Sequence, residues 1–145
     1  MRITDTIASA DVEALHDALH RFNVEATGYD DGRSLSCILR DEHGEIVAGI
    51  DGHTWGGWAH VDVLFVAATR RGTGLGSRML AAAEAEAARR GCRFITLGTH
   101  SFQAPDFYRT RGYEVVSTID DAPLGHRDLM LRKMLAPAGS ATPRS

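Results

Sequence analysis

The chain has 145 residues, 43% hydrophobic and 24% charged, with a formal net charge of −3 at pH 7. This profile is typical of one globular domain with a sizeable core, and the charge argues against a nucleic-acid-binding protein. No apolar run approaches twenty residues and no basic segment precedes an apolar one at the N-terminus, so we expect neither a membrane span nor a secretory signal.

The first half of the chain predicts one helix among several strands. Apolar side chains recur at helical spacing over residues 11–22, with Ser9 as the expected N-cap. The β-forming segments of this half are residues 1–7, 34–40, 46–52 and 58–66. Residues 41–45 predict the hairpin turn between the second and third of these strands, and the TWGG segment at 54–57 predicts another turn.

The second half begins with the clearest helix, residues 74–91, whose apolar face carries Leu75, Met79 and Leu80 and which stops at Gly91. The later expected elements are a strand at 92–99, a short helix at 104–111, and strands at 112–118 and 127–135. The order β-α-β-β-β-α-β-α-β-β predicts a mixed α/β fold in a single domain over residues 1–135. We expect the small, polar residues 136–145 to form a disordered tail.

Cys37 and Cys92 stand alone in the sequence and form no disulfide framework. We interpret both as buried free thiols in a reducing compartment, which predicts a cytoplasmic protein. The HDALH segment places His16 and His20 one helical turn apart, but its acid is aspartate and no third ligand lies nearby, so we expect no metal site.

Three glycines within the segment RRGTGLGSRML, residues 70–80, lie between a strand and the N-terminus of the clearest helix. Exposed backbone N–H groups and the positive end of the helix dipole make such a turn suited to an anion. The alternative is a tight strand-to-helix turn without a ligand. The spacing fits neither the dinucleotide fingerprint nor a P-loop, since no lysine follows.

Two motifs resemble the GNAT superfamily of N-acyltransferases. Residues 71–76, RGTGLG, are similar to the family's acyl-CoA pyrophosphate motif R/Q-x-x-G-x-G/A, and residues 104–113, APDFYRTRGY, resemble its later A-x-x-F-Y-x-x-x-G-[FY] segment. The motifs stand in the family's order, and the element pattern covers nearly the whole chain. The resemblance implies the GNAT fold: a mixed, mostly antiparallel sheet splayed between its fourth and fifth strands and flanked by helices.

The resemblance also implies acetyl-CoA as co-substrate, with the pantetheine arm in the splay and the pyrophosphate on the glycine turn. Ser101 stands where many family members have asparagine. The implied coenzyme-binding residues are Leu64, Phe65, Val66, Arg71, Gly72, Thr73, Gly74, Leu75, Gly76, Ser77, Ser101, Ala104 and Phe107.

Amine attack on a thioester needs a group that takes the amine proton and one that protonates the departing thiolate. Tyr108, at the family's tyrosine position, is the candidate general acid; the alternative is a core tyrosine on an amphipathic helix. Strand alternation predicts His60, Asp62, Leu64 and Val66 on one face, and makes Asp62 and His60 the candidate bases. The alternative for Asp62 is a pair with a nearby arginine.

The expected acceptor is a primary amine of a small, cationic molecule, attacked directly in a ternary complex. Its candidate binding residues are Asp30, Asp31, Trp55 and His100. Within the resemblance, one specific role is the modification of aminoglycoside-type antibiotics; a coenzyme-binding module without turnover and a thioesterase are the alternatives. Such folds commonly form homodimers, and we expect no nucleic-acid or membrane partner.

Overall fold

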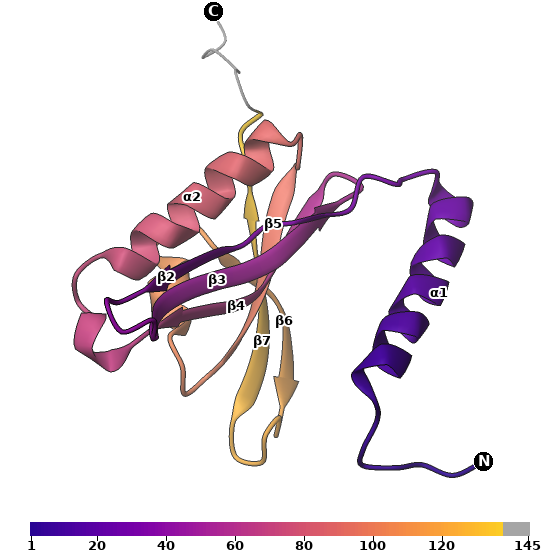
Figure 1. Cartoon of the computed structure of the whole chain (residues 1–145). Coiled ribbons are helices and arrows are strands. Elements are labelled where there is room, and N and C mark those ends of the chain that lie inside the picture. The colour runs from indigo at the N-terminus through magenta and orange to yellow at the C-terminus, as the bar shows by residue number, and fades with distance from the viewer. Residues whose placement is uncertain (138–145) are drawn as a thin grey trace, which may run out of the picture. The chain divides into compact units, whose positions relative to one another are not determined.

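The computed structural model describes residues 1–137 (Figure 1). They form two compact units, residues 1–31 and the residues from 32 onward, and each is described by itself. Most of the predicted tail at 136–145 therefore lies outside the described residues. No helix of the described part is long and apolar enough to cross a lipid bilayer.

The first unit contains one helix, α1, Ser9–Thr27, which is longer than the predicted 11–22. Ser9 is its first helical residue and not the N-cap; Ala8 occupies the cap and its carbonyl accepts the N–H groups of Asp11 and Val12. Gly28 ends the helix at φ 76°, a left-handed conformation that favours glycine. The predicted strand at 1–7 is wrong, because these residues pair with no strand.

The second unit is built on a seven-stranded sheet in the order β1-β3-β4-β5-β7-β6, with β2 also paired to β3. The strands are β1 Arg33–Ser34, β2 Cys37–Arg40, β3 Ile46–Trp55, β4 Trp58–Val66, β5 Phe94–His100, β6 Glu114–Asp120 and β7 Arg127–Met134. The helices are the short η1 Ala68–Arg70, α2 Leu75–Arg89 and α3 Pro105–Arg109. From residue 74 to 135 every predicted element agrees with these bounds to within about two residues.

The hairpin between β3 and β4 turns on two glycines only. Gly56 and Gly57 have φ angles of 56° and 80°, and Trp55 pairs directly with Trp58. The predicted four-residue turn and the strand end at residue 52 are therefore wrong. Two adjacent positive φ angles form a tight hairpin loop, so both strands continue up to the tryptophans.

A β-bulge interrupts the long β3–β4 pairing at Asp62. Asp51 pairs with Val63 and Gly52 with Val61, which leaves Asp62 as the extra residue on β4. A Cβ on Gly52 would lie 2.1 Å from the His60 carbonyl oxygen, so the bulge requires glycine opposite it.

The bulge also switches the faces of β4. Ala59 and Val61 before it are buried in the core, and Leu64 and Val66 after it pack against the same core. The predicted single face carrying His60, Asp62, Leu64 and Val66 is therefore wrong: His60 lies on the opposite face from Leu64 and Val66. One extra residue shifts the two-residue alternation of a strand by one position.

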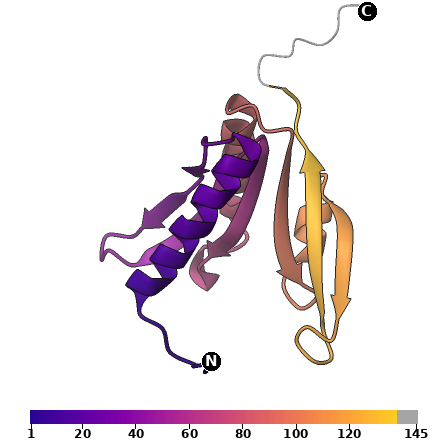
Figure 2. The same ribbon diagram turned by 90° about the vertical axis from the view of Figure 1, so that its right-hand side faces the viewer.

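The predicted splay between the fourth and fifth strands is confirmed. β4 and β5 pair in parallel only between residues 58–61 and 94–97, while β4 continues to Val66 and β5 to His100. All other pairs of the sheet are antiparallel. Figure 2 shows the two halves of the sheet diverging beyond this short parallel stretch.

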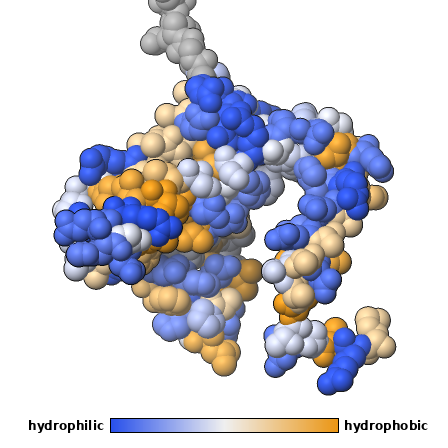
Figure 3. Space-filling view, in the orientation of Figure 1, coloured by the Kyte–Doolittle hydropathy of each residue, from blue (hydrophilic) through white to orange (hydrophobic). Residues whose placement is uncertain are grey.

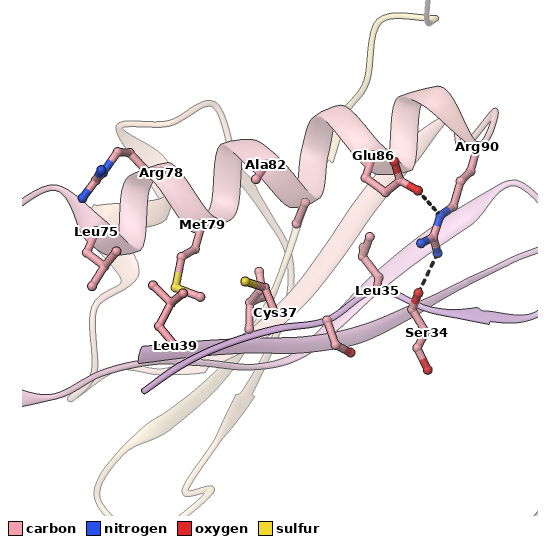
Figure 4. A pocket seen from close by; sticks show the side chains of 13 residues that line it. Ser34, Leu35, Cys37, Leu39, Leu75, Arg78, Met79, Ala82, Glu86 and Arg90 are labelled. Atoms are coloured by element: carbon pink, nitrogen blue, oxygen red, sulfur yellow. Dashed lines mark hydrogen bonds and ion pairs between the residues drawn. The ribbon is translucent and has the colours of Figure 1, made fainter. Parts of the chain in front are cut away.

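Helix α2 covers one face of the sheet, where Met79, Leu80, Ala83 and Ala87 join the core. Its C-terminal end is fixed to the sheet by Arg90, which donates to Glu86 and to the Ser34 carbonyl at 2.8 Å (Figure 4). Arg90 also donates to the Thr54 hydroxyl.

An apolar groove of about 440 Å³ lies between α2 and β2, seen as the orange surface beside α2 in Figure 3 and in detail in Figure 4. Cys37 lines it and is exposed, whereas Cys92 is buried. The prediction of two buried thiols is thus wrong for Cys37, because α2 does not reach over β2 far enough to cover it.

Candidate active site

A cleft of about 680 Å³ opens where β4 and β5 separate. Its walls are the end of β4, which pairs with β3 but no longer with β5, the end of β5 and the loop leading into α3. Its lining residues are Asp62, Val63, Leu64, Phe65, Val66, Arg71, Gly98, Thr99, Phe102, Gln103, Ala104 and Tyr108. Because β5 no longer pairs with this part of β4, the edge of β4 is open to an extended ligand that hydrogen-bonds as a strand would.

A second cavity, of about 440 Å³, lies over the glycine turn and the start of α2. Gly72 and Gly74 have φ angles of 76° and 79°, and Gly74 is the N-cap of α2. The first i→i−4 bond of α2 is donated by Arg78 to the Gly74 carbonyl, so the N–H groups of residues 75–77 have no partner within the helix. No acidic residue lies in this first turn, which suits it to an anion.

Three arginines line this second cavity: Arg70, Arg71 and Arg111. The Arg71 Nε donates to the Val66 carbonyl at 3.0 Å, which ties the turn to the end of β4. Arg111 donates to the Ser77 hydroxyl at 3.0 Å, and its guanidinium carbon lies 3.8 Å from the centre of the Phe107 ring. Arg111 was not among the predicted residues; its place three residues after Tyr108, inside the APDFYRTRGY motif, was the available signal.

Tyr108 lines both the cleft and the second cavity. Only 9% of the residue is exposed, and its ring makes edge contacts with those of Phe107 and Tyr113. Burial raises the pKa of the Tyr108 phenol, so this hydroxyl keeps its proton at neutral pH. The geometry therefore supplies a proton donor where the two cavities meet.

Asp62, at the bulge, lies between two histidines. Its Oδ1 is 3.6 Å from Nε2 of His60, and its Oδ2 is 3.7 Å from Nδ1 of His53. Burial lowers the pKa of His60; the Asp62 charge opposes this effect, and His53 adds to it. His53 was missed because the strand was expected to end at Gly52; a two-residue loop at Gly56 and Gly57 places residue 53 opposite residue 60.

The structure brings most of the predicted coenzyme-binding residues to these two cavities. Thr73 is among the exceptions, since its hydroxyl donates to the Arg70 carbonyl at 2.7 Å within the turn. Ser101 is another: its hydroxyl accepts the N–H of Arg127 at 2.9 Å and so ties it to β7. A Cβ on Gly76 would meet Val66 at 3.4 Å, so the protein itself would accept alanine there.

The predicted acceptor-binding residues are more dispersed. His100 stacks on Phe102, which lines the cleft, and its Nδ1 lies 3.2 Å from the Ala122 carbonyl. Trp55 lies at the tip of the β3–β4 hairpin and lines neither cavity. Asp30 and Asp31 belong to the first unit, where Asp30 lies 3.7 Å from His20.

The two cavities share Leu64, Val66, Arg71, Ala104 and Tyr108, so they form a continuous lining. One part offers free N–H groups and three guanidinium groups to an anion, and the other offers an open strand edge. Acetyl-CoA, with a diphosphate and an amide-containing arm, fits this sequence of surfaces.

Among known proteins, the chain resembles acetyltransferases. The model of the acetyltransferase (GNAT) family matches residues 5–113. Blasticidin-S acetyltransferase from Streptomyces morookaense is 45% identical over 95 residues, 65% of this chain and 70% of that protein. An acetyltransferase from Agrobacterium fabrum is 31% identical over 132 residues, 90% of this chain and 96% of that protein.

The fold has close counterparts among solved structures. The crystal structure of an acetyltransferase from Bacillus cereus superposes with a TM-score of 0.75 at 29% identity, covering 93% of this chain and 99% of that one. The fold of this chain is thus shared with another acetyltransferase.

Proposed function

The chain belongs to the acetyltransferase (GNAT) family and is an acetyl-CoA-dependent enzyme, and we propose that it acetylates a primary amine of a small, cationic acceptor. The transfer is direct, in a ternary complex. The observation that carries this proposal is the cleft itself, which Asp62 and Tyr108 both line.

The coenzyme is held by the chain's own backbone and arginines. The N–H groups of residues 75–77 and the guanidinium groups of Arg71 and Arg111 bind the diphosphate, and the open edge of β4 binds the pantetheine arm. Bound in this way, acetyl-CoA supplies a thioester carbonyl that an amine can attack.

Charge in the cleft favours a cationic acceptor. Among the residues that line it, Asp62 carries the negative charge and Arg71 the positive one, and Arg71 is held against Val66. An ammonium group is attracted to the Asp62 carboxylate, which is about half exposed. The relative that acetylates blasticidin S, at 45% identity, supports an antibiotic amine as the acceptor.

Different residues carry out the two proton transfers of the reaction. The Asp62–His60 pair takes the proton that the amine nitrogen loses as the new N–C bond forms. Tyr108 gives its phenolic proton to the sulfur as the C–S bond breaks; burial raises the pKa of this phenol, so it carries the proton at neutral pH.

An amine panel tests the proposal. The purified protein is incubated with acetyl-CoA and, separately, blasticidin S, an aminoglycoside, a polyamine and a lysine-containing peptide, and free thiol release is measured. We expect release that depends on the amine and is fastest with blasticidin S. Release without any amine, or with the peptide alone, would contradict the proposal.

A further inference from the structure

A buried threonine lies behind the histidine that faces Asp62. Thr96, on β5, is 8% exposed, and its hydroxyl oxygen is 2.7 Å from Nδ1 of His60 and 2.8 Å from the indole nitrogen of Trp58. The parallel pairing places Thr96 directly beside His60. This contact lies within the 58–61 stretch, just before the strands separate and the cleft opens.

The hydroxyl of Thr96 has one proton, and the distances from its oxygen to the neighbouring acceptors indicate which of them receives this proton. The Trp58 indole can only donate, so it occupies one lone pair of the Thr96 oxygen. Two acceptors remain: the Ala59 carbonyl at 3.5 Å and the His60 Nδ1 at 2.7 Å. A separation of 3.5 Å is at the limit of a hydrogen bond, so the proton points to His60.

The tautomer of His60 follows. When Nδ1 accepts a hydrogen bond, the single proton of the neutral ring lies on Nε2. That nitrogen is 3.6 Å from Oδ1 of Asp62, so the N–H dipole faces the carboxylate. The other tautomer would turn a lone pair toward the negative charge, which is unfavourable.

The neutral state of the ring has its own support. Burial lowers the pKa of His60, and His53 lowers it further, against the opposing charge of Asp62. On the neighbouring strand β7, the residue paired with Thr96 is the charged Arg132. The lowered pKa favours the uncharged ring at neutral pH, and in this tautomer Nε2 carries a proton and has no lone pair with which to take another.

We propose that Thr96 and Trp58 are positioning residues that hold neutral His60 with its proton on Nε2, so that Asp62, and not His60, accepts the proton of the acceptor amine. This rests on the proposed function and refines it. The proton that leaves the amine nitrogen ends on a carboxylate oxygen of Asp62, while the N–H of His60 and the ring of His53 flank that carboxylate.

The tautomer is measured first, in the free enzyme, where acetyl transfer plays no part. Nitrogen-15 NMR of the histidine rings at neutral pH distinguishes Nε2–H from Nδ1–H. We expect Nε2–H for His60 in the wild-type protein and in Thr96→Ser. In the near-isosteric Thr96→Val, which removes the donor, we expect the nitrogen-15 shift of Nδ1 to change, because this nitrogen loses its hydrogen bond. A wild-type ring protonated on Nδ1 would overturn the proposal.

Kinetics then identify the proton acceptor. His60→Gln keeps an amide N–H that can donate to Asp62, so its kcat should stay within about tenfold of wild type. Asp62→Asn should lose about a hundredfold or more. Thr96→Val should lower kcat without changing the KM for acetyl-CoA, and Thr96→Ser should restore it.

The outcomes distinguish a failure of this inference from a failure of the proposed function. If His60→Gln loses as much as Asp62→Asn, or if Asp62→Asn remains active, Asp62 is not the acceptor and the inference fails. If the wild-type ring carries its proton on Nε2 but no amine of any kind is acetylated, the proposed function fails on its own.

Discussion

Two neighbouring phenols, Tyr108 and Tyr113, lie in edge contact with their ring centres 5.8 Å apart. Tyr108 lines the cleft, whereas the Tyr113 hydroxyl is buried without a hydrogen-bond partner among residues 1–137. Tyr108→Phe should lower kcat by about a hundredfold or more with little change in the KM for acetyl-CoA, because it removes the proton donor. Steady-state kinetics at saturating amine measure both constants.

Tyr113→Phe is the matched control, since it makes the same chemical change in the same ring cluster. Its activity should be unchanged, and its free energy of unfolding should stay equal or rise by about 1 kcal/mol, because an unpaired buried hydroxyl is removed. Equal rates for wild type and Tyr108→Phe would remove Tyr108 from the mechanism.

The titration of His60 is a second prediction for single residues. Its pKa should lie below the ordinary 6.5, because burial opposes the charged ring. Asp62→Asn should lower this pKa further, and His53→Ala should raise it, since the two charges act in opposite directions. The proton NMR shift of the ring, followed against pH, reports the midpoint.

The same shift affects stability with a definite sign. As the pH falls, the unfolded chain binds a proton at His60 near pH 6.5, whereas the folded chain binds it only at a lower pH. The contribution of His60 to stability is therefore complete above pH 6.5 and falls as the pH drops toward the folded pKa. If the NMR titration of Asp62→Asn gave the same pKa for His60 as in the wild-type protein, the carboxylate would not act on this ring.

Among the strands, the bulge at Asp62 determines the direction in which β4 continues along the cleft. Gly52→Ala would place a methyl group 2.1 Å from the His60 carbonyl oxygen, so β3 and β4 must move apart. We expect a loss of about 1–3 kcal/mol in the free energy of unfolding, measured by urea denaturation. Activity should fall as well, because His60 and Asp62 adjoin the displaced backbone.

Gly98→Ala provides the comparison within the same sheet. Its new methyl group would lie 3.9 Å from the Leu129 carbonyl oxygen, an ordinary contact. Its stability should remain within about 0.5 kcal/mol of wild type. Similar losses in both variants would mean that the bulge does not specifically require glycine.

For the whole molecule, coenzyme binding should stabilise the fold by mass action. At a concentration one hundred times its Kd, CoA should add about 2.7 kcal/mol and raise Tm by about 10 °C. At the same CoA concentration Arg111→Met should reduce this rise, because it removes a charge from the second cavity while keeping a side chain to cover Phe107. Differential scanning calorimetry measures both shifts.

Arg109→Met controls for general loss of positive charge. Arg109 pairs with Asp106 on the surface and lines neither cavity, so its variant should keep the full rise in Tm. An absent rise in the wild-type protein would contradict the placement of the diphosphate at the glycine turn.

The sequence by itself determined the elements from residue 74 to 135, the glycine turn and the family. These signals are local: the apolar face of α2, the glycines at 72 and 74, and the Phe107–Tyr108 motif each act within a few residues of the chain. The resemblance to the family also implied the splay between β4 and β5, which the pairing confirms.

Only the tertiary structure decided which side chains meet around Asp62. The bulge reversed the faces of β4, the two-residue hairpin placed His53 opposite His60, and the parallel pairing brought Thr96 beside His60. Such contacts depend on strand register, and a shift of one residue exchanges the two faces of a strand. Local sequence patterns do not encode that register, because it arises from the packing of segments that are distant along the chain.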